Sequence, residues 1–371
     1  MKLPPFILDQ WLAAHEFASP PIRFNLASST GPPWTLGELI ELAGTELRDE
    51  LDGLRVSYAP PQGSKPLRER IAQFYGVDPD WVVVTTGASE ALSILFCAAS
   101  EPDGAVLLPV PAFPAMPVMA EAWGLGVQGY LLDRHEGFAQ RADRILSNAD
   151  RKTRLALINT PHNPTGSVMA EREMTTLAES LAERNIPLLV DEVYHPLYFD
   201  RQPRSAACIP NAIVVSDFSK ALSLSGLRLG WIIDRDAERR ERLIDLRSYF
   251  TISGSPLTEA IATHVLACHD ALVSRLRAVA ESNLRLLKRF MEQRQDIIRW
   301  VPPSGGTVTF PWLLDGRDSR TLCQILAREG VLIVPGDCFG ASDHFRMGIG
   351  AQAGGFEEAL AIVGRVLDVA R

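Results

Sequence analysis

Between about residue 80 and residue 235, short apolar runs alternate with stretches in which apolar residues recur at helical spacing. The runs predict strands at 81–85, 105–109, 155–159, 187–191, 212–216 and 230–233. The amphipathic stretches predict helices that include 89–99, 118–123 and 170–184. Apolar strands that alternate with helices form sheets covered on both faces, so the pattern predicts an α/β fold with a mostly parallel sheet flanked by helices.

The chain after this region has a different pattern. A long amphipathic stretch at 257–294 predicts a helix that leads away from the sheet, and short apolar pieces follow at 307–313, 331–334 and 344–348. Further helices are predicted at 319–329 and 355–369. This mixture indicates a smaller α+β domain completed by the N-terminal segment. We expect a large domain over residues 40–265 and a small domain made of residues 1–39 and 266–371.

Composition narrows the class of protein. The 371 residues are 46% hydrophobic and 22% charged, and the net charge of −8 argues against nucleic acid or an anionic membrane surface as a partner. No apolar stretch is long enough to cross a bilayer, and the N-terminus lacks the pattern of a signal peptide. The five cysteines include no CxxC pair, which is typical of free thiols in a reducing compartment. We therefore expect a cytoplasmic protein.

One group of residues has the composition of a partial metal site. His264, Cys268 and His269 lie close together in a stretch of helical pattern. A structural or catalytic metal site needs further ligands, and no second ligand pair accompanies these three residues. We therefore predict that they pack in the fold and that the protein binds no metal.

The segment 216–230, SDFSKALSLSGLRLG, carries the strongest chemical indication in the chain. Lys220 follows Ser219, and Arg228 lies eight residues further on. A lysine forms a Schiff base with an aldehyde cofactor, and an arginine can bind the phosphate of such a cofactor. Taken alone, a lysine in such a loop is more often an ordinary surface residue, so its interpretation depends on the rest of the chain.

Two motifs can complete a cofactor site. Gly87, Ala88 and Ser89 follow a predicted strand and open a helix, where free backbone N–H groups and the helix dipole favour an anion. The alternative for this motif is an ordinary helix cap. Phe113, after the next strand, offers a flat face to a cofactor ring, although a core aromatic has the same pattern.

Further polar residues lie at or near the ends of predicted strands. Asn163, in NTPHNPTG, can donate a hydrogen bond to a phenolate oxygen, with a plain turn as the alternative. Asp191 ends the most apolar strand, where it can hold a pyridine nitrogen protonated, and Tyr194 can reach the ring oxygen. Arg346, in an apolar strand, fits a bidentate carboxylate or a structural salt bridge. Together with Lys220, these residues predict pyridoxal-phosphate chemistry on amino acids.

The sequence resembles the aspartate-aminotransferase fold family of pyridoxal-phosphate enzymes, the class I and II aminotransferases, from about residue 25 to the C-terminus. The motifs NPTG, DEVY, SK and GLRLG, in this order, carry the resemblance. It implies that Lys220 holds pyridoxal 5'-phosphate as a Schiff base and acts as general base, with Asp191 at the pyridine nitrogen. The other implied contacts are Asn163 and Tyr194 with the ring oxygen, Phe113 with the ring face, Gly87, Ala88, Ser89, Ser219 and Arg228 with the phosphate, and Arg346 and Asn163 with the substrate.

The resemblance also implies that the protein forms an oligomer. At one position the sequence departs from the family pattern. Tyr58 matches the family's tyrosine that reaches the phosphate of the neighbouring subunit, which implies a homodimer with shared active sites. Three positions before Lys220, where the family usually has serine or threonine, this chain has Asp217. Because a carboxylate repels a phosphate, we expect Asp217 to turn away, toward a backbone N–H or a basic residue. Ser216 or Ser219 would then supply the hydroxyl.

The resemblance leaves the reaction open. Transamination is favoured, and an elimination or cyclisation enzyme similar to a carbon–sulfur lyase is the alternative. Arg247 is offset from the position where dicarboxylate-specific members carry a second arginine, so we expect a substrate with a neutral or apolar side chain. Trp34 is expected either to line the substrate pocket or to pack. A non-catalytic ligand sensor is disfavoured, because the chain has no basic patch and no room for a DNA-binding module.

Overall fold

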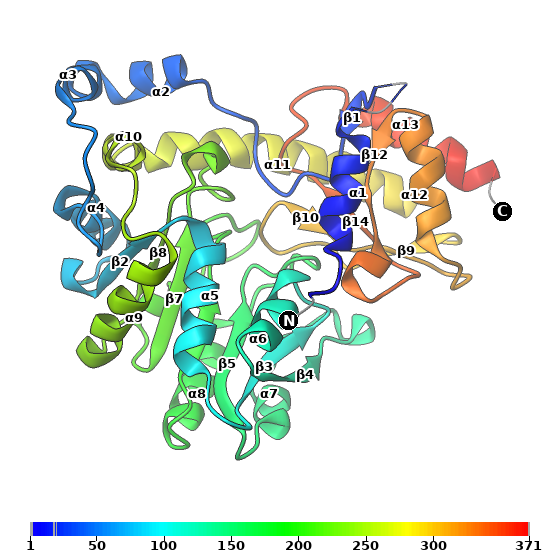
Figure 1. The fold of residues 1–371 in the computed structure, drawn as a ribbon. Helices are drawn as coiled ribbons and strands as arrows, with labels where there is room; N and C mark the ends of the chain where they lie inside the picture. The colour runs from blue at the N-terminus through cyan, green and yellow to red at the C-terminus, as the bar shows by residue number, and fades with distance from the viewer. Residues whose placement is uncertain (1–2, 18, 20, 370–371) are drawn as a thin grey trace.

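Seven strands form the central sheet, in the order β2-β8-β7-β6-β5-β3-β4 (Figure 1). The computed structural model describes residues 3–17, 19 and 21–369. The strands are β2 (Val82–Thr85), β3 (Ala105–Val110), β4 (Gly126–Leu131), β5 (Thr153–Asn159), β6 (Leu188–Asp191), β7 (Ala212–Asp217) and β8 (Gly230–Ile233). Only β8 runs antiparallel to its neighbours, β2 and β7. The predicted mostly parallel α/β sheet is therefore confirmed.

The sheet is buried on both faces because alternate residues of each apolar strand point to opposite sides. Val83 packs in one hydrophobic cluster, while its neighbours Val82 and Val84 pack in the other. The Val83 side is covered by α5 (Gly87–Ala99), α6 (Ala115–Ala122) and α9 (Ala237–Phe250). The other side is covered by helices that include α4 (Lys65–Tyr75), α7 (Ala142–Asn148), α8 (Glu171–Ala182) and α10 (Pro256–Leu266).

Two features of this region differ from the sequence prediction. Strand β4 was not predicted, because it lies at the sheet edge with most of its residues exposed and has no continuous apolar run. The single helix predicted over 257–294 is wrong, since this stretch forms α10 and then α11 (His269–Glu292). The two helices are separated at Ala267 and Cys268, where neither proline nor glycine signals a break.

The N-terminal segment packs against the C-terminal part of the chain. Strand β1 (Phe24–Asn25) pairs in parallel with β12 (Val331–Leu332), and the indole N–H of Trp11 in α1 (Ile7–Glu16) donates to the Ile333 carbonyl at 2.8 Å. Nearby, β14 (Phe345–Gly348) lies between β10 (Val308–Thr309) and β13 (Val334–Pro335). In Figure 1, α12 (Ser319–Arg328) and α13 (Phe356–Val369) flank these short strands. The remaining helices and strands are α2 (Leu36–Ala43), α3 (Thr45–Gly53), β9 (Ile298–Arg299) and β11 (Trp312–Leu313).

The arrangement of the sheet brings polar residues together at its carboxyl edge. Asn159 ends β5 and is opposite Asp191, which ends β6, while Asp217 ends the next strand, β7. Ligand sites in parallel sheets form at this edge. Among the described residues, no helix combines the length and the apolar character that crossing a membrane requires.

Candidate active site at the carboxyl edge of the sheet

A cavity of about 200 Å³ opens at the carboxyl edge of the central sheet. Its walls come from strand ends, the start of α5 and a loop of the N-terminal segment. The lining residues are Thr30, Ala88, Ser89, Leu92, Phe113, Asn159, Asn163, Asp191, Val193, Tyr194, Asp217, Ser219, Lys220, Ser225 and Arg228. The cavity therefore gathers most of the site residues predicted from the sequence.

Among the residues that the structure describes, Lys220 is the only lysine that lines this cavity. Its ammonium nitrogen, Nζ, donates a hydrogen bond to Ser29 Oγ at 2.8 Å. Burial lowers the pKa of the Lys220 amine, and the negative charge of Asp217 opposes that shift. An amine with a lowered pKa is neutral for a larger fraction of the time near neutral pH, which is the form that acts as nucleophile or base. Sequence reasoning missed Ser29, because its contact with Lys220 joins residues 191 positions apart.

Asp191 is a buried carboxylate at the end of β6. The Val193 backbone N–H donates to Asp191 Oδ1 at 3.1 Å. Burial raises the pKa of Asp191 to about 7, and the Asp217 charge adds to this increase while Lys220 opposes it. A carboxylate in this environment is stabilised by any cationic or N–H partner placed in the cavity.

Asn163 and Arg346 form a connected pair beside the cavity. The side-chain oxygen of Asn159 accepts the Asn163 backbone N–H at 2.7 Å, which fixes the loop after β5. Arg346 in β14 donates from Nη1 to Asn163 Oδ1 at 3.1 Å and from Nη2 to the Ala27 carbonyl at 2.8 Å. Its Nε lacks a hydrogen-bond partner, as does the buried Tyr194 hydroxyl. Both groups are available to a bound molecule.

The start of α5 forms an anion cradle with Arg228. Gly87 has a φ of +79°, and a Cβ at this position would lie 2.9 Å from Arg228 Nη2, so a side chain would displace the guanidinium. A Cβ on Gly230 would lie 2.8 Å from the Ala88 backbone nitrogen, which explains why the last residue of GLRLG is glycine. The N-cap residue of α5, Thr86, makes no side-chain cap. The first backbone N–H groups of the helix are thus left for an anion.

Asp217, the residue that departs from the family pattern, has a hydrogen-bond partner in the backbone. Asp217 is buried, and its Oδ1 accepts the Ser219 backbone N–H at 2.8 Å, the kind of contact expected from the sequence. The carboxylate nevertheless lines the cavity. Ser216 donates its hydroxyl to the Glu192 carbonyl at 3.1 Å and is not part of the cavity wall. Of the two serines considered, only Ser219 faces the site.

Three other residues predicted for the site, Phe113, Trp34 and Tyr58, differ in how they lie relative to the cavity. Phe113 lines the cavity and contacts the ring of Phe6 edge to face, with 6.0 Å between centroids. Trp34 lies outside the cavity wall, and Arg275 packs over its ring at 4.2 Å, in agreement with the packing alternative. Tyr58 is 81% exposed and contributes nothing to the cavity of its own chain.

Two further sets of side chains considered from the sequence, Arg247 and the partial metal site, make their contacts outside the cavity. The fully buried Arg247 faces Glu90, with 3.7 Å between Arg247 Nε and Glu90 Oε2, and it does not line the cavity. His264 contacts Glu50, and Cys268 contacts the Leu42 carbonyl. Within the described residues, no group of three or more histidine, cysteine or acidic side chains is arranged to hold a metal.

Comparison with known proteins gives a consistent result. The chain matches the family model for aminotransferase class I and II over residues 34–363. It is 32% identical to capreomycidine synthase of Streptomyces vinaceus, over 98% of this chain and 94% of that protein. A PLP-dependent aminotransferase from Streptococcus suis 89-1591 has a TM-score of 0.92 at 26% identity, covering 100% of this chain and 99% of that one. The PLP-dependent cyclase OrfR, in complex with Au, has a TM-score of 0.89 at 25% identity with the same coverage.

Proposed function

This chain belongs to the class I and II aminotransferase family, whose cofactor is pyridoxal 5'-phosphate, and from that premise we propose that it moves the amino group of an L-amino acid to a 2-oxo acid. The observation that carries the proposal is the position of Lys220, partly buried in a cavity that Asp191 and Arg228 also line. A lysine, a buried carboxylate and a phosphate-binding arginine are the groups that this chemistry requires.

The residues in the cavity fit the cofactor. The start of α5 at Ala88 and Ser89, with Ser219 and Arg228, would hold the phosphate, because the cradle supplies N–H donors and a cation. Asp191 would bind the ring nitrogen. Asn163 and the unpaired Tyr194 hydroxyl would bind the ring oxygen, and Phe113 would cover the ring. When bound, the cofactor draws electrons from the substrate's α-carbon and so makes its proton acidic.

The chain's own residues would then bind and deprotonate the substrate. Lys220 Nζ would take the α-proton and return it, and Ser29 would hold the amine in position between these steps. Arg346 would bind the substrate carboxylate, because it is buried, its Nε is unpaired and Asn163 holds the rest of the guanidinium. Exclusion of water from this buried site would strengthen these charge interactions.

The substrate side chain is proposed to be neutral or apolar. Arg247, which lies close in sequence to the position expected for a second carboxylate-binding arginine, is fully buried beside Glu90. We also propose a cytoplasmic homodimer, in which the exposed Tyr58 reaches the phosphate site of the other subunit. Tyr58 is 81% exposed in the single chain, so its side chain is free to make such a contact.

A second candidate reaction is elimination or cyclisation, in which the same α-proton is removed and a group leaves from the neighbouring carbon. It is favoured by the identity of 32% with a protein named capreomycidine synthase over 98% of this chain. The structural likeness to a cyclase points the same way. Both reactions begin at Lys220, so the cavity geometry supports either one.

A single-turnover experiment separates the two reactions. Holoenzyme is mixed with each common L-amino acid, and the cofactor and products are identified by mass spectrometry. Transamination predicts conversion of the cofactor to pyridoxamine phosphate together with one equivalent of a 2-oxo acid. Product that keeps forming while the cofactor stays pyridoxal phosphate would contradict transamination and support elimination or cyclisation. A protein that binds the cofactor and leaves every tested amino acid unchanged would contradict the proposed substrate class.

A further inference from the structure

Asp217 gives this chain a second carboxylate in the cavity, at the position where related proteins usually have a hydroxyl side chain. It is buried at the end of β7, and the Ser219 N–H fixes its Oδ1 at 2.8 Å. The same hydrogen bond keeps the carboxylate at the wall of the cavity that Ser219 and Arg228 line. Its contact with the backbone thus satisfies one oxygen without removing the charge from the site.

The neighbouring cations do not cancel this charge by direct contact. Arg228 forms no ion pair among those found in the described part of the chain, and its Nη1 donates to the Ser225 carbonyl at 3.1 Å. Lys220 donates to the Ser29 hydroxyl instead of a carboxylate. The phosphate of the cofactor would therefore enter a cavity in which the Asp217 carboxylate lies beside the cationic cradle without an ion pair.

We infer that Asp217 weakens the phosphate-dependent part of cofactor binding by this enzyme. The inference rests on the proposed use of this cavity for pyridoxal 5'-phosphate. Two anions in a partly desolvated site repel each other more strongly than in water, and the opposing attraction comes from Arg228 and the α5 N-terminus. The Asp217 charge also raises the pKa values of Lys220 and Asp191, but its repulsion of the phosphate is absent when the bound analogue lacks the phosphate.

The test compares the dissociation constants of pyridoxal 5'-phosphate and of pyridoxal, which lacks the phosphate. Both are measured by absorbance titration of cofactor-free protein, for the wild type, Asp217→Asn and Asp217→Ser. Asp217→Asn keeps an acceptor for the Ser219 N–H, removes the charge and replaces the second oxygen with an NH2 donor. Asp236→Asn serves as the control, because it removes the same charge from the N-cap of α9, at the opposite edge of the sheet.

The measured quantity is the ratio of the pyridoxal constant to the pyridoxal-phosphate constant. The inference predicts that this ratio rises at least about tenfold in both Asp217 variants and stays unchanged in Asp236→Asn, since removing one nearby charge is worth that much in a partly desolvated site. Using the ratio removes any effect of the variants on the Lys220 amine, because that amine reacts with both aldehydes. A ratio that is unchanged or lower in Asp217→Asn would overturn the inference. If the wild type bound neither aldehyde, the proposed function itself would fail.

Discussion

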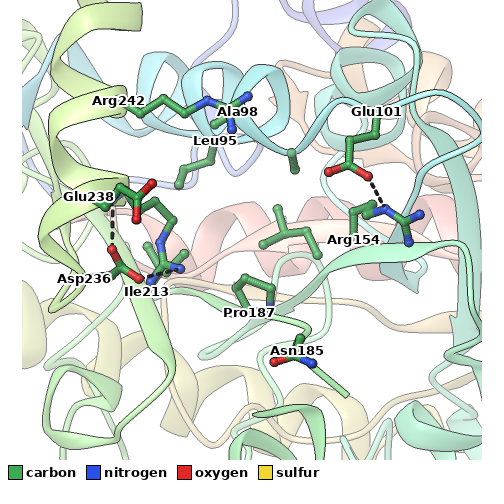
Figure 2. A pocket seen from close by; sticks show the side chains of 13 residues that line it. Leu95, Ala98, Glu101, Arg154, Asn185, Pro187, Ile213, Asp236, Glu238 and Arg242 are labelled. Atoms are coloured by element: carbon green, nitrogen blue, oxygen red, sulfur yellow. Dashed lines mark hydrogen bonds and ion pairs between the residues drawn. The ribbon is translucent and has the colours of Figure 1, made fainter. Parts of the chain in front are cut away.

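Cavities lie at both edges of the central sheet, and a larger cavity at the amino edge differs in its chemistry from the candidate active site. The cavity at the amino edge measures about 380 Å³, compared with about 200 Å³ at the carboxyl edge. Figure 2 shows the larger cavity, with Arg154 paired to Glu101 on one side and the apolar side chains Leu95 and Ile213 toward the other. There Arg154 Nε lies 2.7 Å from Glu101 Oε2, so these opposite charges already satisfy each other.

The smaller cavity has polar groups that the fold leaves unpaired. Tyr194 lines this cavity with a buried hydroxyl that lacks a partner, and the Nε of Arg346 behind it is also unpaired. The described residues of the amino-edge cavity include no such atom. At the carboxyl edge, strand ends and a helix N-terminus meet, which supplies N–H donors and side chains without consuming them in the sheet. The unpaired buried hydroxyl of Tyr194, more than volume, therefore distinguishes the carboxyl-edge cavity from this amino-edge cavity.

The largest effect should come from removing the reactive amine. Lys220→Ala is expected to lower kcat on the order of 10⁴-fold or more, because the base and cofactor linkage are lost together. Arg242→Ala, at an exposed arginine of the amino-edge cavity, is expected to change kcat less than about twofold. Steady-state assays of both variants give the two kcat values to be compared. Similar losses in the two variants would mean that the carboxyl-edge cavity is not the active site.

A smaller loss is expected from Asp191→Asn. An amide cannot stabilise a protonated ring nitrogen as a carboxylate does, so kcat should fall about 10²- to 10³-fold. Asp191→Glu keeps the charge and should recover part of the activity. The measurement is kcat for the three proteins after saturation with cofactor. Equal activity of Asp191→Asn and the wild type would contradict the assigned role.

Arg346→Lys tests the substrate end of the cavity. Lysine keeps the charge but loses the two-point geometry that Arg346 shares with Asn163 and Ala27. We expect kcat/KM to fall about 10- to 100-fold, mainly through KM. Cofactor affinity, measured separately, should stay within about threefold of the wild-type value, because Arg346 is not among the phosphate-site residues. A large loss of cofactor affinity would place Arg346 in the cofactor site instead.

The pH dependence of stability tests the environment of Asp191. Burial raises its pKa from 3.8 to about 7, so the folded protein holds this proton more tightly than the unfolded chain does. The stabilising contribution is therefore complete below the unfolded pKa and is lost as the pH rises through the folded pKa. Between about pH 5 and about pH 8, cofactor-free wild type should lose roughly 1–3 kcal/mol of unfolding free energy relative to Asp191→Asn. Parallel urea-unfolding profiles for the two proteins would contradict this environment.

The smallest effect is expected in the amino-edge cavity. Glu101→Gln breaks the ion pair with Arg154, in which the Glu101 side chain is 61% exposed. Such a pair contributes less than about 1 kcal/mol, so thermal unfolding and kcat should change little. A loss of activity comparable to that of Asp191→Asn would show that the two edges are coupled.

The sequence predicts those parts of the sheet and of the candidate site that are indicated by a pattern within a short stretch of the chain. Asp191 and Asn163 follow apolar strands, and parallel strands bring their carboxyl ends to one edge, so their proximity follows from the pattern. Strand β4 has exposed edge positions and therefore little apolar signal. Ser29 approaches Lys220 only through the tertiary fold, and no local pattern indicates that contact.

The most direct test of the account is to locate the cofactor on the chain. Holoenzyme is reduced with borohydride, digested, and its peptides are identified by mass. The chain has five lysines, and Lys65, Lys152 and Lys288 are exposed to solvent, away from the cavity. The account predicts one reduced pyridoxyl-phosphate adduct, on Lys220. An adduct on another lysine, or none on a protein that retains the cofactor, would contradict the central claim.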